Sequence, residues 1–149
     1  MSVREDTAQL YFRMFTEVAI IAQLSGNRLE RVLPEGMSQA QFGVLTHFVR
    51  LGGKWSPGRL ARAFQVTKGA MTNTLQRLEA QGFVRIEADP KDARGKLAEI
   101  TEAGRRARDA AVRATGATMA ELVALIPASD VKGALPFLER VRQVLDGAR

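Results

Sequence analysis

The chain has 149 residues, of which 46% are hydrophobic and 26% charged, a composition that supports a folded domain with its own core and argues against disorder. It contains no cysteine and one histidine, which excludes disulfides, thiolate metal sites, thiol-based redox sensing and a structural zinc. The longest apolar run, VAIIA at 18–22, is too short to span a bilayer, and MSVREDTAQLYF lacks a signal-peptide pattern. We therefore expect a single domain over residues 1–149, located in the cytoplasm, with no membrane partner.

The formal net charge of +6 is concentrated in the middle of the chain. Residues 50–113 hold 14 Lys and Arg against 7 Asp and Glu, a net +7, whereas the two ends together are slightly acidic. A basic centre between non-basic arms is typical of a domain that binds a polyanion. Because many basic domains bind no nucleic acid, the charge supports this interpretation only together with a motif.

Residues 7–33 are predicted to form a long helix that is apolar over more than one face. Such a helix is usually buried from two directions, and in a domain of this size the second direction is often another subunit. We therefore interpret residues 6–33 as a dimerisation helix, which ends at Pro34 and Gly36. Its apolar positions are Leu10, Tyr11, Phe12, Met14, Phe15, Val18, Ile20, Ile21, Leu24, Leu29, Val32 and Leu33.

A shorter amphipathic helix is predicted to follow. Ser38 and Gln41 can form a capping box, and the pair Gly52-Gly53 would end the helix. The single histidine, His47, falls within it. A lone histidine is more often a packing residue than a ligand, so we assign His47 no chemistry. The apolar positions at helical spacing are Phe42, Leu45 and Val49.

The next two predicted helices are joined by a very short turn, Gln65-Val66. Trp55 occupies an extended stretch, and Ser56-Pro57 then forms a good N-cap and first-turn pair. The small residue Ala61 allows the two helices to cross closely. This arrangement indicates a helix-turn-helix motif, although a purely structural helical hairpin is the alternative.

The helix after this turn has one apolar side and one slim, polar side. Thr67 can cap its start, and Gly82 can end it in a left-handed conformation. At 100° per residue, Met71, Leu75 and Leu78 share the apolar side. The other side carries no large apolar residue, so the backbone could approach a partner closely.

We interpret the polar side as a surface that reads DNA, rather than as an ordinary solvated helix face. Asn73 and Gln76 offer the paired donor and acceptor that suit adenine edges in the major groove. The basic surroundings favour this interpretation. The candidate contacts on the helix are Thr67, Lys68, Gly69, Thr72, Asn73, Gln76 and Arg77.

Beyond Gly82 the apolar period changes from that of a helix to that of strands. Alternating stretches at 84–88 and 96–101 predict a β-hairpin with its connection, DPKDARG, at 89–95. A basic hairpin tip directly after a recognition helix is typical of a wing. Asp92 has the wrong charge for DNA, so we expect it to hold a neighbouring guanidinium in place, the alternative being a turn-forming aspartate. The candidate contacts on the wing are Lys91, Asp92, Arg94 and Lys96.

The run LEAQGFVRIEADPKDARGKLAEITEAG at 78–104 resembles the signature of the MarR family of winged-helix transcriptional regulators. That signature links a Leu-Glu-x-x-Gly helix end, an Asp-x-Arg wing and a Leu-Thr-x-x-Gly exit at fixed distances. The resemblance is strong over residues 55–104, and the flanking helices agree with it in length and order. Two positions depart from it, because Ile100 replaces the usual leucine and Ala98 replaces a larger aliphatic residue. We therefore expect a more loosely packed wing.

The resemblance implies a winged helix-turn-helix fold, mainly α with a small β-hairpin. It implies a DNA-binding core at 37–101 and dimerisation helices at 6–33 and 102–146. It also implies a homodimer that binds a pseudo-palindromic operator in double-stranded DNA, usually as a repressor released by a small-molecule effector, with no cofactor and no metal. By position, residues 67–77 would enter the major groove, and Arg94, paired with Asp92, would enter the minor groove.

The last third of the chain is predicted to be helical. Thr101 can cap a helix that runs to Pro127, and a final helix follows, in which Pro136 marks either a kink or the start. These helices lack an intramolecular partner, so pairing across a two-fold axis is the simplest way to bury them; the alternative is a monomer whose end helices cover the winged helix. Their apolar positions are Val112, Met119, Leu122, Ile126, Val131, Leu135, Leu138, Val141, Val144 and Leu145.

Two other functions compete with DNA binding as interpretations of this sequence. The chain offers no nucleophile with a base, no metal cluster and no phosphate-binding loop, so we do not expect an enzyme. A winged-helix module used for protein–protein contact, without sequence-specific DNA binding, is the stronger alternative. The cations Lys68, Arg77, Arg94 and Lys96 argue against it. The sequence indicates neither the operator, the regulated genes, the effector, nor the sign of regulation.

Overall fold

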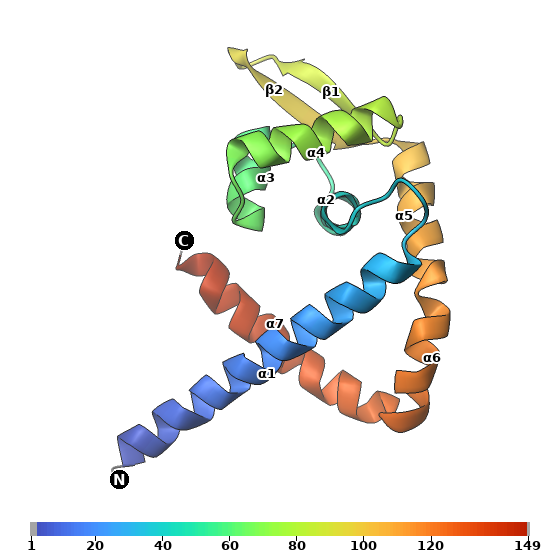
Figure 1. Ribbon diagram of the computed structural model, residues 1–149. Helices are drawn as coiled ribbons and strands as arrows, with labels where there is room; N and C mark the ends of the chain where they lie inside the picture. Colours follow the sequence, from blue (N-terminus) through green and yellow to red (C-terminus); the bar gives the residue numbers. More distant parts are fainter. Residues whose placement is uncertain (1–2, 149) are drawn as a thin grey trace. The chain divides into compact units, whose positions relative to one another are not determined.

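A computed structural model describes residues 3–148 (Figure 1), and the chain divides into two compact units, Met1–Ala114 and Thr115–Arg149. As predicted, the fold is mainly α with one small β-hairpin. Between residues 3 and 148 no helix combines the length and the apolar character needed to cross a membrane. The first unit contains α1 (Val3–Val32), α2 (Gln39–Leu51), α3 (Pro57–Phe64), α4 (Lys68–Ala80), β1 (Val84–Asp89), β2 (Asp92–Ile100) and α5 (Glu102–Ala114). The second contains α6 (Gly116–Leu125) and α7 (Ala128–Gly147).

The helix starts in the first unit follow the capping residues read from the sequence. Ser38 Oγ accepts the Gln41 N–H at 3.2 Å and the Ser38 N–H donates to Gln41 Oε1 at 2.9 Å, which confirms the capping box of α2. Ser56 accepts the Arg59 N–H at 3.2 Å, and Thr67 accepts the Ala70 N–H at 3.1 Å. These bonds satisfy backbone donors that a helix start leaves unpaired, so each cap sets where its helix begins.

The core of the first unit lies between α2, α3, α4 and the hairpin. Figure 1 shows α4 running between the hairpin and α2. Met71, Leu75 and Leu78, the predicted apolar side of α4, are all buried. Burying each such side chain contributes about 1.5–3 kcal/mol, which fixes the face that α4 turns inward. The other core residues are Val44, Leu45, Phe48, Leu60, Ala61, Val84, Ala98 and Ile100.

The hairpin is longer than the sequence pattern indicated. β1 and β2 pair antiparallel from Val84 opposite Ile100 to Asp89 opposite Asp92, so the predicted connection at 89–95 is wrong. Asp89 accepts the Lys91 N–H at 2.9 Å, and Asp92 accepts the Arg94 N–H at 3.0 Å. These local bonds close a short turn, and the register shift between Ala88 and Asp89 accommodates the extra residues of β2.

The two wing positions that depart from the family signature both belong to the core. Ala98 is fully buried and Ile100 nearly so. The extended segment at Trp55 forms a β-bridge to Ala98, with N–H···O distances of 2.9 and 2.8 Å in the two directions. Trp55 therefore adds a one-residue strand to the edge of β2, and its side chain packs against the core that contains Ala98.

The exit from the hairpin explains why glycine stands at 104. Thr101 Oγ1 donates to the Gly82 carbonyl at 2.6 Å and accepts the Gly104 N–H at 3.1 Å, which caps α5 as predicted. A Cβ atom at Gly104 would lie 2.1 Å from the Phe83 carbonyl oxygen. Only glycine permits this close approach, so the α5 start is tied to the end of α4.

The predicted helix from 101 to 126 is two helices, because α5 ends at Ala114 and α6 begins at Gly116. A β-branched threonine followed by glycine is a weak place in a helix, and the apolar spacing alone does not reveal it. The last helix begins at Ala128 and continues through Pro136. Pro136 therefore does not mark its start, although it removes one intrahelical hydrogen bond there.

Candidate nucleic-acid interface

The side of α4 predicted to face DNA is turned away from the core. Thr72 is half-buried, and the other six candidates are exposed. The helix also ends as predicted, because Gly82 has a φ of 75°. The exposed candidates are Thr67, Lys68, Gly69, Asn73, Gln76 and Arg77.

A cleft of about 300 Å³ separates α4 from the hairpin. Thr72 and Gln76 line it from α4, and Arg94 and Lys96 line it from β2. Pro57, the first residue of α3, lies at the same cleft. The structure thus brings together four of the predicted site residues from two elements. The remaining candidates on α4, and Lys91 and Asp92 on the hairpin, do not line this cleft.

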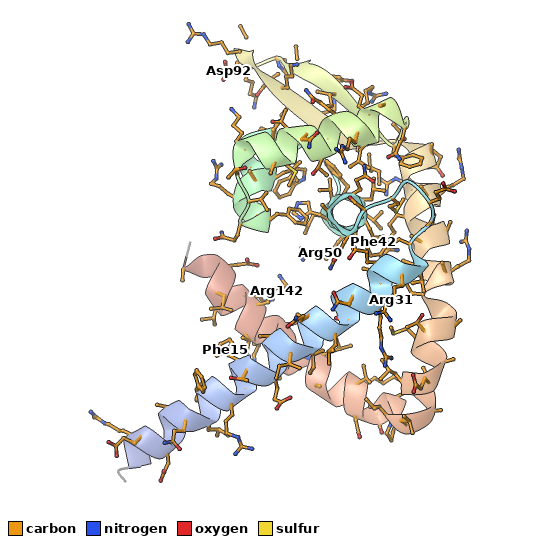
Figure 2. The ribbon with its side chains drawn as sticks, viewed as in Figure 1. Phe15, Arg31, Phe42, Arg50, Asp92 and Arg142 are labelled. Atoms are coloured by element: carbon orange, nitrogen blue, oxygen red, sulfur yellow. The ribbon has the colours of Figure 1, made fainter. Side chains whose placement is uncertain are left out.

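Asp92 lies at the end of the hairpin (Figure 2). Its carboxylate accepts a hydrogen bond from the backbone N–H of Arg94, whereas the sequence led us to expect a bond to a guanidinium. Asp92 and Arg94 are both exposed. The geometry therefore links Asp92 to the backbone conformation at Arg94.

Three charged side chains of the hairpin form an ion-pair network with Lys54, which lies between α2 and α3. Lys54 Nζ lies 2.9 Å from Glu87 and 4.0 Å from Glu99, and Arg85 lies 2.8 Å from Glu87 and 3.0 Å from Glu99. The hydrogen bond between Lys54 and Glu87 lowers the pKa of the Glu87 carboxyl and raises the pKa of Lys54. Because these groups are exposed, the network adds little stability. Its consequence is electrostatic, since it neutralises two of the basic residues counted in the sequence.

The cations of the candidate interface are not neutralised in this way. Among the residues that the structure describes, no carboxylate lies within 4.0 Å of their charged nitrogens. Two carboxylates that the sequence analysis did not single out, Glu79 and Glu87, line the cleft. The unpaired cations lie on α4 and the hairpin and are Lys68, Arg77, Lys91, Arg94 and Lys96.

A cluster of rings lies where α2, α3 and the Trp55 segment meet. His47 is only 7% exposed, and its ring centroid lies 4.5 Å from that of Trp55 and 5.4 Å from that of Phe64. Burial lowers the pKa of His47, and the nearby Arg50 and Arg59 lower it further. His47 is therefore a neutral packing residue at pH 7, in line with the sequence interpretation.

One cation of this cluster was not predicted from the sequence. The Arg59 guanidinium lies 4.2 Å from the centroid of the Trp55 ring, a cation–π geometry. The two residues are four positions apart, on either side of the Ser56-Pro57 helix start. That spacing was the available signal, but only the fold shows that the guanidinium lies over the ring.

A helix-turn-helix whose second helix is followed by a basic hairpin defines a winged helix-turn-helix protein. A sequence profile described as MarR family matches residues 35–95. The transcriptional activatory protein BadR of Rhodopseudomonas palustris is 31% identical over 99 residues, which cover 65% of this chain and 55% of BadR. The multiple antibiotic resistance protein MarR of Escherichia coli is 35% identical over 75 residues, which cover 50% of this chain and 51% of MarR. Over this region the chain is similar to the MarR family.

The matched region spans about half the length of these two relatives. The similarity in three dimensions extends further. A crystal structure of a MarR mutant from Escherichia coli complexed with operator DNA matches with a TM-score of 0.67 and 25% identity, over 95% of this chain and 99% of that one. The order of helices and hairpin is therefore shared over nearly the whole chain.

Proposed function

We propose that this protein is a transcriptional regulator that binds a pseudo-palindromic operator in double-stranded DNA as a homodimer. The observation that carries the proposal is the cleft where Thr72 and Gln76 of α4 meet Arg94 and Lys96 of the hairpin. Hydrogen-bonding side chains beside unpaired cations suit a partner with base edges and phosphates. The operator complex of the Escherichia coli relative supports the same function.

Each part of the interface has its own task in this proposal. Asn73 and Gln76 read base edges in the major groove, where their amide groups can pair with adenine. Arg94 enters the minor groove, whose width and negative potential attract a guanidinium. The remaining contacts, Thr67, Lys68, Gly69, Thr72, Arg77, Lys91 and Lys96, approach the sugar-phosphate backbone.

Both units expose apolar side chains that a second copy would cover. Phe12 on α1 and Val123 on α6 are each 74% exposed. Phe15, labelled in Figure 2, is a further exposed aromatic residue of α1. A second subunit would remove this surface from water and would present a second recognition helix. The half-site centres would then lie about 34 Å, or about 10 base pairs, apart.

We further propose that DNA binding represses transcription and that a small molecule releases the operator. The absence of cysteine leaves peroxide no thiol to oxidise, and a single histidine gives zinc no nitrogen-rich ligand set. Low-micromolar zinc or modest peroxide should therefore leave the operator complex intact. Release by zinc, reversed by a chelator, would contradict this. A reporter gene placed behind the operator measures the sign of regulation, which matters because BadR is named an activator.

The test selects DNA duplexes that the protein binds from a random pool. The affinity for the selected duplex is then measured at increasing salt concentrations. If phosphates are contacted, the affinity falls steeply as the salt concentration rises. The salt slope is the slope of the logarithm of the affinity against the logarithm of the salt concentration. Replacing Arg94 by Gln should weaken binding and reduce the magnitude of this slope by about 1. Arg85→Gln is the matched control, because it removes the same charge from an ion-paired position.

The alternative, a winged-helix module for protein contact, predicts the opposite outcome. Such a module would enrich no duplex from the pool and would show no steep dependence on salt. The selection therefore decides between the two functions. A selected site found in DNA upstream of the protein's own gene would in addition establish autoregulation.

A further inference from the structure

Trp55 is held in place by contacts on three sides. Its backbone forms both hydrogen bonds of a bridge to Ala98, at 2.9 and 2.8 Å. Its indole Nε1–H donates to the Gly52 carbonyl at 2.8 Å, and the His47 ring packs against the indole ring in a T-shaped arrangement. The indole plane is therefore fixed relative to the hairpin before any ligand binds.

Arg59 uses this fixed ring as a support. Its guanidinium lies 4.2 Å from the ring centroid, and the residue is exposed. Over residues 3–148, no carboxylate comes within 4.0 Å of this guanidinium, whereas Arg85 contacts both Glu87 and Glu99. A guanidinium with one face on a ring keeps its N–H edges free for hydrogen bonds in the plane. Arg59 is thus a pre-oriented cation with no internal anion.

The position of Arg59 connects it to the candidate interface. It lies in the first turn of α3, where its own backbone N–H bonds to Ser56. Pro57, in the same turn, lines the cleft together with Gln76 and Arg94. In a helix-turn-helix the first helix crosses the DNA backbone while the second enters the groove. The first turn of α3 therefore lies beside the path of a strand that passes between α4 and the hairpin.

We propose that Arg59 binds a backbone phosphate of the DNA and that Trp55 is the positioning residue that orients it. The inference rests on the proposed DNA-binding function. Holding the guanidinium on the ring before binding reduces the side-chain freedom that is lost when a phosphate is bound. The contact fixes the register of α4 on the duplex without reading sequence.

The experiment measures affinity of the full-length protein for its selected duplex, and for a random duplex, across a range of salt concentrations. Arg59→Gln should weaken binding to both duplexes by roughly tenfold at low salt and reduce the salt slope by about 1. Arg85→Gln, which removes the same charge from the ion-pair network, should leave the slope unchanged.

Two further variants separate contact from positioning. Arg59→Lys keeps the charge but loses the planar stacking group, so the slope should persist while the affinity falls. Trp55→Leu should likewise lower the affinity and leave the salt slope in place. The double variant with Arg59→Gln should lose less binding free energy than the sum of the losses of the two single variants. Circular dichroism melts of every variant establish whether it folds. If Arg59→Gln does not fold, the Arg59→Lys and Trp55→Leu measurements carry the test.

Each outcome has a defined meaning. If the wild-type protein binds no duplex in a salt-dependent manner, the proposed function itself fails. If wild type binds and Arg94→Gln reduces the slope while Arg59→Gln does not, only the role of Arg59 is overturned. A lower melting temperature for Arg59→Gln with an unchanged slope would make the stack a structural brace. A Trp55→Leu variant that binds like wild type would remove the positioning role.

Discussion

The hydrogen bond between Asp92 and the backbone of Arg94 allows geometry to be separated from charge at the hairpin tip. Asp92→Ala removes both the acceptor that orders the tip and the negative charge. Asp92→Asn removes only the charge, because the amide oxygen can still accept the Arg94 N–H. If Asp92 orders the tip, the two variants should change DNA affinity in opposite directions.

The magnitudes favour the geometric effect. A side-chain-to-backbone hydrogen bond contributes about 0.5–1.5 kcal/mol. A unit charge about 10 Å from a phosphate costs only about 0.4 kcal/mol in water, and salt screens it further. The two terms partly cancel in Asp92→Ala, which should therefore weaken operator binding by up to roughly sixfold, whereas Asp92→Asn should tighten it by up to about twofold.

Fluorescence anisotropy with a labelled operator at low and moderate salt measures both changes. Asp92→Ala should add little once Arg94 is already alanine, since the ordered tip then has no guanidinium to present. Arg94→Ala alone is the reference for that comparison. If Asp92→Ala and Asp92→Asn tighten binding equally, charge alone governs the tip and the ordering role must be abandoned.

Three other outcomes are expected. Asn73→Ala or Gln76→Ala should each reduce the binding free energy for the operator by about 1–3 kcal/mol and bring it closer to that for random DNA. Equal losses of affinity for both duplexes would exclude base reading. The intact protein should be a dimer by light scattering at micromolar concentration, whereas a chain lacking residues 1–33 should be monomeric or insoluble; a monomeric intact protein would refute the dimer. Burial, with Arg50 and Arg59 nearby, lowers the folded-state pKa of His47 from 6.5, so the unfolded chain binds more protons and stability should fall as pH drops below about 6.5. Urea unfolding of His47→Leu should show less of this pH dependence, and an identical dependence would assign it to other groups.

Local signals were enough to predict the helix starts and the buried side of α4. Each cap hydrogen bond, such as that from the Ala70 N–H to Thr67, joins residues three positions apart. Both partners can therefore be recognised in one short stretch of sequence. The inward side of α4 follows from the spacing of Met71, Leu75 and Leu78, because a helix has one period and only one side that can bury all three. The MarR signature added the order of these elements.

Two features could not be predicted from the sequence: the full length of the hairpin and the boundary between α5 and α6. The alternation of apolar and polar residues stops at Ala88 and resumes at Lys96. The pattern therefore indicates a long loop, although β2 begins at Asp92. The strand there depends on two backbone hydrogen bonds to aspartates and on a shift of register, neither of which leaves a hydrophobic period. The break at Thr115 was hidden for a related reason, because apolar spacing continued across it.

Only the tertiary structure decided which charged side chains pair with each other and which have no carboxylate nearby. The sequence counts Lys54 and Arg85 with the other cations of the basic centre, but the fold brings both against Glu87 and Glu99. It leaves Arg59 stacked on a ring without a carboxylate in the described part of the chain. A composition is a sum over residues, whereas electrostatic pairing depends on distances of a few ångströms between elements that are far apart in the chain.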